Sequence, residues 1–137
     1  MIVMSREPLI SIVDDDESVR DAVQTLLEST GRHTVAFASA EQFLASSVVR
    51  ATRCLILDLR MPGINGEELQ RRLLAAGYRL PTIVLTAHGD DAARARALTA
   101  GAVAFLRKPF QPDTLLEAVE ASLRLAADVP DDSRGSR

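Results

Sequence analysis

Short apolar runs alternate with segments of helical character along most of this 137-residue chain. The apolar runs are LISIV, HTVAFA, TRCLILD, LPTIVLTAHG and AVAFLRKPF, which begin at residues 9, 33, 52, 80 and 102. Segments with helical spacing or helix start and stop signals follow them at 17–31, 39–48, 65–77, 90–102 and 112–127. Strands that are apolar throughout are covered on both faces, which is typical of parallel sheets between two layers of helices.

This order predicts a single α/β domain with five βα units and a doubly wound parallel sheet. Because crossovers are right-handed, few topologies remain, and we expect the flavodoxin-like (βα)5 arrangement with strand order 2-1-3-4-5. We assign residues 1–8 to an N-terminal extension, 9–126 to the domain and 127–137 to a disordered tail or linker stub. In such sheets, ligands bind at the carboxyl ends of the strands, where the strand order reverses.

Composition and charge narrow the classes of function. The formal net charge of -3 gives no broad attraction to nucleic acids or acidic membranes, so we expect this domain to contact neither. MIVMSREP lacks the pattern of a signal peptide, and no apolar run approaches the roughly 20 residues that span a bilayer, which favours a cytoplasmic protein. The only cysteine, Cys54, lies in an apolar run and is expected to be buried and unreactive.

Polar side chains end four of the five predicted strands. Asp14 and Asp15 follow the first strand, and Asp58 ends the buried run CLILD, after which the chain turns away at MPG. Thr86 ends the fourth strand and Lys108 the fifth. Since the carboxyl ends of parallel strands meet at one edge of a sheet, we expect these side chains to share a single cleft.

The grouping of carboxylates predicts a site for a divalent cation and phosphoryl chemistry. Carboxylates that face one another in a partly dry cleft repel, so one takes a proton or a cation binds. Oxygen ligands favour Mg²⁺, whereas the two histidines, His33 and His88, are not placed to make zinc a good candidate. A carboxylate nucleophile, a divalent cation, a lysine and a hydroxyl are the groups that phosphoryl transfer requires. The nucleotide-binding patterns GxxxxGK[ST] and GxGxxG are absent, so we expect no nucleotide cofactor.

Four stretches resemble those of response-regulator receiver domains, the CheY-like superfamily, in its FixJ-like branch. They are IVDDDESVR, LILDLRMPGINGEEL, PTIVLTAHGD and AGAVAFLRKPF, and the likeness covers roughly residues 9 to 125. Each motif alone is weak, but their order on an alternating βα pattern is highly specific. The resemblance implies that the protein is a phosphorylation-controlled switch of a two-component system.

The resemblance also implies the roles of the acidic residues. Asp58 would be the phosphoacceptor, and Asp14 and Asp15 the acidic pair that holds Mg²⁺. The backbone carbonyl of Arg60 would be a further metal ligand, together with Asp58 itself. Asp16 can be read as another ligand or as the N-cap of the first helix, and we favour the N-cap.

Three more residues receive roles by the same resemblance. Thr86 and Lys108 would contact the phosphoryl group, and the Lys108–Pro109 peptide bond would be cis. Phe105 would be an aromatic switch whose ring moves inward when the Thr86 hydroxyl turns toward the phosphoryl group; the alternative is an ordinary core residue. Arg107 alternates to the other face from Lys108, and we interpret it as a surface residue.

The implied function is acceptance of a phosphoryl group on Asp58 from a sensor histidine kinase, without any enzymatic activity beyond phosphoryl acceptance and autodephosphorylation. The surface of the fourth helix, fifth strand and fifth helix would then switch, forming a homodimer or docking a partner. FixJ-like receivers usually precede a DNA-binding output domain that controls transcription, and this chain reaches only Arg137. It is either a stand-alone receiver or a fragment, and DVPDDSRGSR favours the fragment.

Two functions of other classes also use such a sheet. A Mg²⁺-dependent phosphatase with an aspartyl-phosphate intermediate usually has a second Asp two residues after its nucleophile, where this chain has Arg60. A receiver used only as an unphosphorylated scaffold needs no intact acidic site, whereas Asp14, Asp15 and Asp58 are all present. Both patterns therefore favour the switch.

Overall fold

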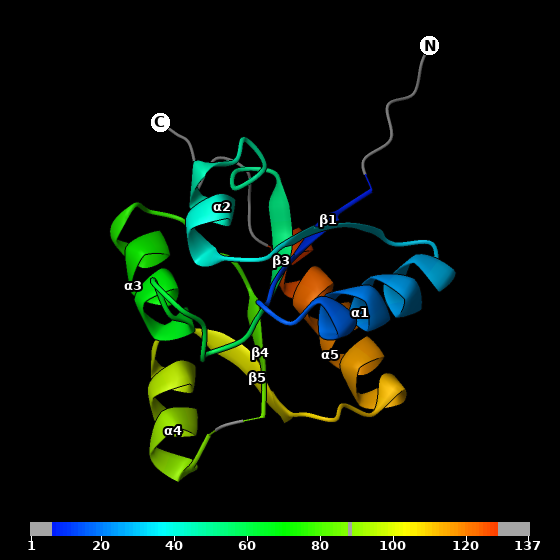
Figure 1. The fold of residues 1–137 in the computed structure, drawn as a ribbon. Helices are drawn as coiled ribbons and strands as arrows, with labels where there is room; N and C mark the ends of the chain where they lie inside the picture. The colour runs from blue at the N-terminus through cyan, green and yellow to red at the C-terminus, as the bar shows by residue number, and fades with distance from the viewer. Residues whose placement is uncertain (1–6, 88, 129–137) are drawn as a thin grey trace.

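The computed structural model describes residues 7–87 and 89–128, and within them five parallel strands form one sheet in the order β2-β1-β3-β4-β5 (Figure 1). The strands are β1 (Leu9–Val13), β2 (His33–Phe37), β3 (Thr52–Leu57), β4 (Thr82–Thr86) and β5 (Ala102–Arg107). The helices are α1 (Glu17–Ser29), α2 (Ala40–Ala45), α3 (Gly66–Ala75), α4 (Asp91–Thr99) and α5 (Pro112–Asp128). The predicted fold class and strand order are confirmed. His88, residues 1–6 of the predicted extension and residues 129–137 of the predicted tail lie outside the described residues.

Two layers of helices cover the sheet (Figure 1). Helices α1 and α5 pack on one face, where Val23, Leu27, Leu115 and Val119 meet the inward side chains of β1, β3 and β4. Helices α2, α3 and α4 cover the other face. Since both faces are covered, the side chains in the middle of the strands are mostly apolar, with the buried hydroxyl of Ser11 in β1 as an exception.

Capping residues fix where each helix begins and so orient the strand ends. Asp16 is the N-cap of α1, since its carboxylate accepts from the Ser18 N–H at 2.9 Å, which favours the capping interpretation over the metal ligand. Ser39 caps α2 in the same way, by accepting from the Gln42 N–H at 3.1 Å. Because α1 begins after Asp16, Asp14 and Asp15 lie at the junction between β1 and α1.

Helix α2 is shorter than the spacing of SAEQFLASSV predicts, because it ends at Ala45. The Ser46 hydroxyl donates to the Phe43 carbonyl at 2.8 Å and accepts from the Val48 N–H, which offers the backbone a turn in place of another helical turn. Cys54 is fully buried, as predicted, and burial raises the pKa of its thiol to about 12. Among the described residues, no helix has the length and apolar character needed to cross a bilayer.

Candidate functional site

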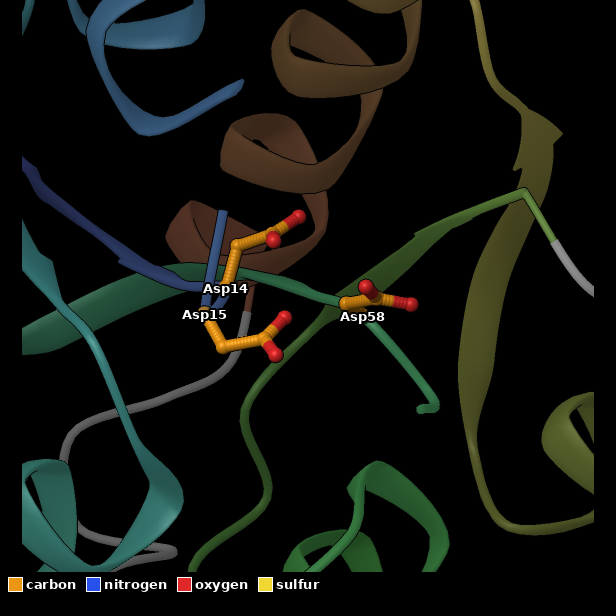
Figure 2. Close-up of side chains that lie close together, drawn as sticks. All are labelled: Asp14, Asp15 and Asp58. Atoms are coloured by element: carbon orange, nitrogen blue, oxygen red, sulfur yellow. The ribbon is translucent and has the colours of Figure 1, made fainter. Parts of the chain in front are cut away.

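Three carboxylates meet at the carboxyl end of the sheet. Asp14 and Asp15 follow β1, and Asp58 follows β3, the strand that pairs with it. One carboxylate oxygen of each lies within 4.8 Å of the others, and Figure 2 shows the side chains of Asp14 and Asp15 extending toward the side on which Asp58 lies. Asp14 and Asp58 are buried, at 2% and 5% exposure, whereas Asp15 is exposed. The predicted convergence of these acids is confirmed.

Lys108 reaches this group from the end of β5. Its Nζ lies 2.9 Å from Oδ2 of Asp14 and 3.1 Å from Oδ2 of Asp58, and its side chain is only 15% exposed. The backbone brings it there, because the Lys108 N–H donates to the Thr86 carbonyl at 3.0 Å and extends the β4–β5 pairing by one residue. The lysine is thus a fixed positive charge that joins two buried negative ones.

Burial sets the protonation of this group. It raises the pKa of Asp14 above its usual range, and the hydrogen bonds from the Asp16 N–H and Lys108 only partly offset it. Burial also lowers the pKa of Lys108, but the hydrogen bonds and charges of Asp14 and Asp58 outweigh it, so the net shift is upward. Burial thus disfavours the ionised form of Asp14, whereas the two carboxylates favour the protonated form of Lys108.

The other two predicted residues lie at the β4–β5 side of the same edge. Thr86 is fully buried at the end of β4. The ring of Phe105 is half-buried and packs against the small cluster around Val84 and Ala93. A Cβ on Gly89 would lie 2.5 Å from Cζ of this ring, so the loop after β4 approaches Phe105 closely, and a larger residue at position 89 would require the ring to shift.

Two further sequence predictions at this edge have structural outcomes. The peptide bond between Lys108 and Pro109 is cis, as the resemblance implied. Arg107 is exposed, as expected for a surface residue, and its guanidinium donates to the Gly89 carbonyl at 2.6 Å. Arg107 thus contacts the loop after β4.

Both ends of the loop that follows β3 lie close to Asp58. The Arg60 N–H donates to Oδ1 of Asp58 at 3.2 Å, and the Gly66 N–H donates to the Leu59 carbonyl at 3.0 Å. A Cβ on Gly66 would overlap with the carbonyl oxygen of Asp58, so α3 can start this close to the acid only with glycine at that position. The predicted role of the Arg60 carbonyl as a metal ligand stays a prediction.

Comparison with known proteins identifies the family. The sequence pattern described as the response regulator receiver domain matches residues 10–120, which is most of the chain. The chain belongs to the response regulator receiver domain family. Members of this family are regulatory domains of two-component systems, so the carboxylates belong to a signalling module and not to a conventional enzyme.

Full-length regulators are among the relatives of this receiver domain. It is 41% identical to response regulator protein TmoT of Ectopseudomonas mendocina over 88% of this chain and 55% of the relative. It is 40% identical to transcriptional regulatory protein FixJ of Azorhizobium caulinodans, over 87% of this chain and 56% of the relative. The chain therefore spans about half the length of the curated relatives it matches.

Solved structures agree with the fold and the family. The response regulator StyR superposes with a TM-score of 0.83 at 43% identity, over 89% of this chain and 62% of StyR. The structure titled FixJ-N superposes with a TM-score of 0.77 at 37% identity, over 89% of this chain and 95% of that one. The FixJ-like likeness seen in the sequence motifs is thus confirmed in both sequence and structure.

One residue near the site of this receiver domain was not predicted from the sequence. Glu41, in the first turn of α2, accepts a hydrogen bond from the Ile64 N–H at 3.0 Å. The two residues are 23 positions apart, and no periodicity connects them. The only signal is a carboxylate at a helix start, which occurs equally at Glu17 and Asp91 and does not indicate a contact with the site.

Proposed function

We propose that Asp58 accepts a phosphoryl group from a phosphohistidine of a sensor histidine kinase. The observation that carries this proposal is the placement of one buried carboxylate at the end of the central strand β3, within 3.1 Å of a lysine ammonium and beside two other acids. Burial and the short loop after it hold the carboxylate in one position. A fixed anionic oxygen flanked by positive charge is what in-line attack on phosphorus needs.

Mg²⁺ fits the donor set of this site. Three carboxylates provide hard oxygen ligands that lie close together, and burial, the main cause of the raised pKa of Asp14, disfavours its charge unless a cation lies nearby. We assign Asp14, Asp15, Asp58 and the backbone carbonyl of Arg60 as the residues that would hold the ion. When bound, Mg²⁺ would neutralise charge on the phosphoryl oxygens during transfer.

The transfer uses the chain's own side chains. An oxygen of the Asp58 carboxylate forms a bond to phosphorus while the phosphorus–nitrogen bond of the donor breaks, and the imidazole leaves with the electron pair. Lys108, already directed into the site, then pairs with a phosphoryl oxygen, and the Thr86 hydroxyl donates to another. Water later attacks the same phosphorus, which releases inorganic phosphate and restores the carboxylate.

The phosphoryl group would act on the β4–β5 side of the domain. Movement of Thr86 toward the phosphoryl group leaves space into which the ring of Phe105 turns, and the loop that Gly89 holds against that ring must then shift. The surface of α4, β5 and α5 changes as a result and forms a homodimer or docks a partner. This is a two-state equilibrium that one local charge biases.

We place this activity in a cytoplasmic two-component pathway. The receiver domain would occupy residues 9–126, with 1–8 as an extension and 127–137 as a tail or linker. Relatives that are about twice as long include transcriptional regulatory proteins, which supports control of transcription through an output domain. The receiver itself would contact the kinase and its own output partner, but not nucleic acid or membrane.

Intact-mass spectrometry tests the proposal directly. Incubation with Mg²⁺ and acetyl phosphate should add one phosphoryl group to the wild type and none to Asp58→Asn. Replacement of Mg²⁺ by EDTA should abolish the adduct. Asp113→Asn, at an exposed acid in the first turn of α5, serves as the matched control and should be modified like the wild type.

Each of the other outcomes of this experiment would indicate a different function. Rapid turnover of many phosphoesters without a lasting adduct would indicate a phosphatase. An unmodified wild type would indicate a scaffold, provided that beryllofluoride, which mimics an aspartyl phosphate, also fails to bind. A relative titled the beryllofluoride-activated DrrB receiver domain, 29% identical to this chain, makes that probe appropriate.

A further inference from the structure

The loop of residues 58–65 joins β3 to α3 and carries both Asp58 and Arg60. Local hydrogen bonds fix its two ends, one from the Arg60 N–H to the Asp58 carboxylate and one from the Gly66 N–H to the Leu59 carbonyl. Neither bond constrains the turn in the middle of the loop, which is exposed. The position of this turn therefore depends on contacts from another element.

Glu41 of α2 supplies that contact. Its Oε2 accepts from the Ile64 N–H at 3.0 Å, and it fills the space beside Gly63, where an added Cβ would overlap with the carboxylate. Gly63 has a φ of 74°, a conformation that favours glycine. The hydrogen bond from Ile64, followed by one from the backbone of Glu41 itself, lowers the pKa of this carboxyl, so it is ionised at neutral pH.

Apolar packing holds the same part of the loop against α2. Met61 is buried and Ile64 partly buried in the cluster that contains Ala40 and Phe43 of α2. This packing sets the distance between the loop and α2 but, being non-directional, does not set the orientation of the backbone. The hydrogen bond to Glu41 is directional and selects one orientation.

We propose that Glu41 is a positioning residue for the phosphoryl-acceptor site, which holds the 58–65 loop so that the Arg60 carbonyl is oriented for metal binding before the ion arrives. The inference rests on the proposed function, in which that carbonyl is a ligand. A loop that is already ordered loses less conformational freedom when the ion binds, so the affinity is higher. Glu41 contacts neither the ion nor the phosphoryl group.

The experiment compares Glu41→Ala with Glu41→Gln by amide NMR during a titration with MgCl₂. Glu41→Ala should raise the Mg²⁺ dissociation constant by about three- to tenfold, less than a buried partner of a ligand costs because Glu41 is exposed. Glu41→Gln keeps an oxygen acceptor for the Ile64 N–H and should stay within about twofold of the wild type. Hydrogen exchange at the Ile64 amide should accelerate in the alanine variant only.

Arg32→Ala is the matched control for a loss of stability without a change at the site. Arg32 forms a bidentate ion pair with Glu120 of α5, which involves neither α2 nor the 58–65 loop. The Arg32→Ala substitution should lower the free energy of unfolding and leave the Mg²⁺ dissociation constant unchanged. Equal Mg²⁺ affinity in Glu41→Ala and the wild type, with faster exchange at Ile64, would overturn the inference.

The failure of the proposed function would look different. If the wild type itself shows no saturable Mg²⁺ shifts around residues 14, 15 and 58, or if Asp15→Asn binds the ion as well as the wild type, the metal site is wrong. If those controls behave as proposed and Glu41→Gln weakens Mg²⁺ as much as Glu41→Ala, charge and not loop position is responsible, which also overturns the positioning role.

Discussion

Two polar clusters connect β1 to β3, one buried and one partly exposed, and they differ in kind. Toward the amino end of the sheet, the hydroxyls of Ser11 and Thr52 lie 2.7 Å apart, and Thr52 donates to the Val48 carbonyl at 2.8 Å. We call these two residues the hydroxyl pair. At the carboxyl end, Asp14, Asp15, Asp58 and Lys108 form what we call the charged cluster.

The difference shows which cluster serves structure and which serves function. The hydroxyl pair is neutral and its hydrogen bonds are made within the protein, so it is complete without any ligand. The charged cluster brings three carboxylates together with one ammonium group, which leaves two excess negative charges when all are ionised. A proton or a bound cation is needed to offset this excess negative charge. That requirement is the physical basis of a regulated site.

Removal of the ammonium group should have the largest effect. Lys108→Met leaves Asp14 and Asp58 buried beside each other without their cation, which should lower the free energy of unfolding by about 3–5 kcal/mol at pH 7 without Mg²⁺. Urea denaturation measures this loss. The loss should shrink on acidification, because protonation of one carboxylate removes the repulsion.

The matched comparison is Arg124→Met on α5, an exposed cation outside both clusters, which should change stability by less than about 0.5 kcal/mol. If Lys108→Met were as stable as this control at pH 7, the charged cluster would not depend on its lysine. The contrast with the hydroxyl pair would then be lost.

The charged cluster could be predicted from the sequence because it depends on topology alone. Asp14, Asp58 and Lys108 directly follow strands of one parallel sheet, and the strand order brings the carboxyl ends of those strands together. The hydroxyl pair was not predicted, because Ser11 lies within an apolar strand and its partner is decided by the register between β1 and β3.

Contacts between one helix and another could not be predicted from the sequence either. The bidentate ion pair of Glu67 on α3 with Arg96 on α4 joins a partly buried position to an exposed one, and no local pattern encodes their relative placement. Helix α4 itself buries only Ala93 and Ala97, so its amphipathic signal is weak. Caps such as Asp16 were predicted correctly because they depend only on neighbouring residues.

Disruption of the hydroxyl pair should have the second largest effect. Thr52→Val removes both hydrogen bonds of the Thr52 hydroxyl and leaves the buried Ser11 hydroxyl without this partner, whereas the Val48 carbonyl keeps the backbone N–H groups of Ala51 and Thr52. The cost in urea denaturation should be about 1–3 kcal/mol. The cost should not change with pH between 5 and 8 (approximate limits within which no hydroxyl titrates).

A double-mutant cycle sharpens this prediction. Ser11→Ala combined with Thr52→Val should cost less than the sum of the two single variants, because the second substitution removes a group that the first left unsatisfied. Costs that simply add would show that the two hydroxyls are not coupled and that the pair is not a unit.

Metal binding should affect the charged cluster alone and by a smaller amount. At a Mg²⁺ concentration about ten times the dissociation constant, the wild type should gain roughly 1.4 kcal/mol in the free energy of unfolding. Asp15→Asn should lose most of this gain, whereas Thr52→Val should retain it in full. Chemical denaturation at matched ionic strength, with NaCl replacing MgCl₂, measures the difference.

Substitution of Asp14 should have the smallest and most specific effect, which is a change in the pH dependence of stability. Its pKa in the folded protein is raised by burial above the ordinary value of 3.8, so the folded state binds more protons than the unfolded state between these two values. Stability from this group therefore falls as the pH rises through that window and stays lower above it. Asp14→Asn should remove the fall, so that its advantage over the wild type grows from pH 3.8 upward and then levels off.

The same measurement on Asp21→Asn, an exposed acid on α1, separates this effect from a general change in charge. Its difference from the wild type should vary little with pH, because an exposed carboxylate keeps its hydration in both states. An advantage of Asp14→Asn that shrinks with rising pH would mean that Lys108 stabilises the ionised carboxylate more than burial opposes it. The charged cluster would then be complete without a cation, like the hydroxyl pair.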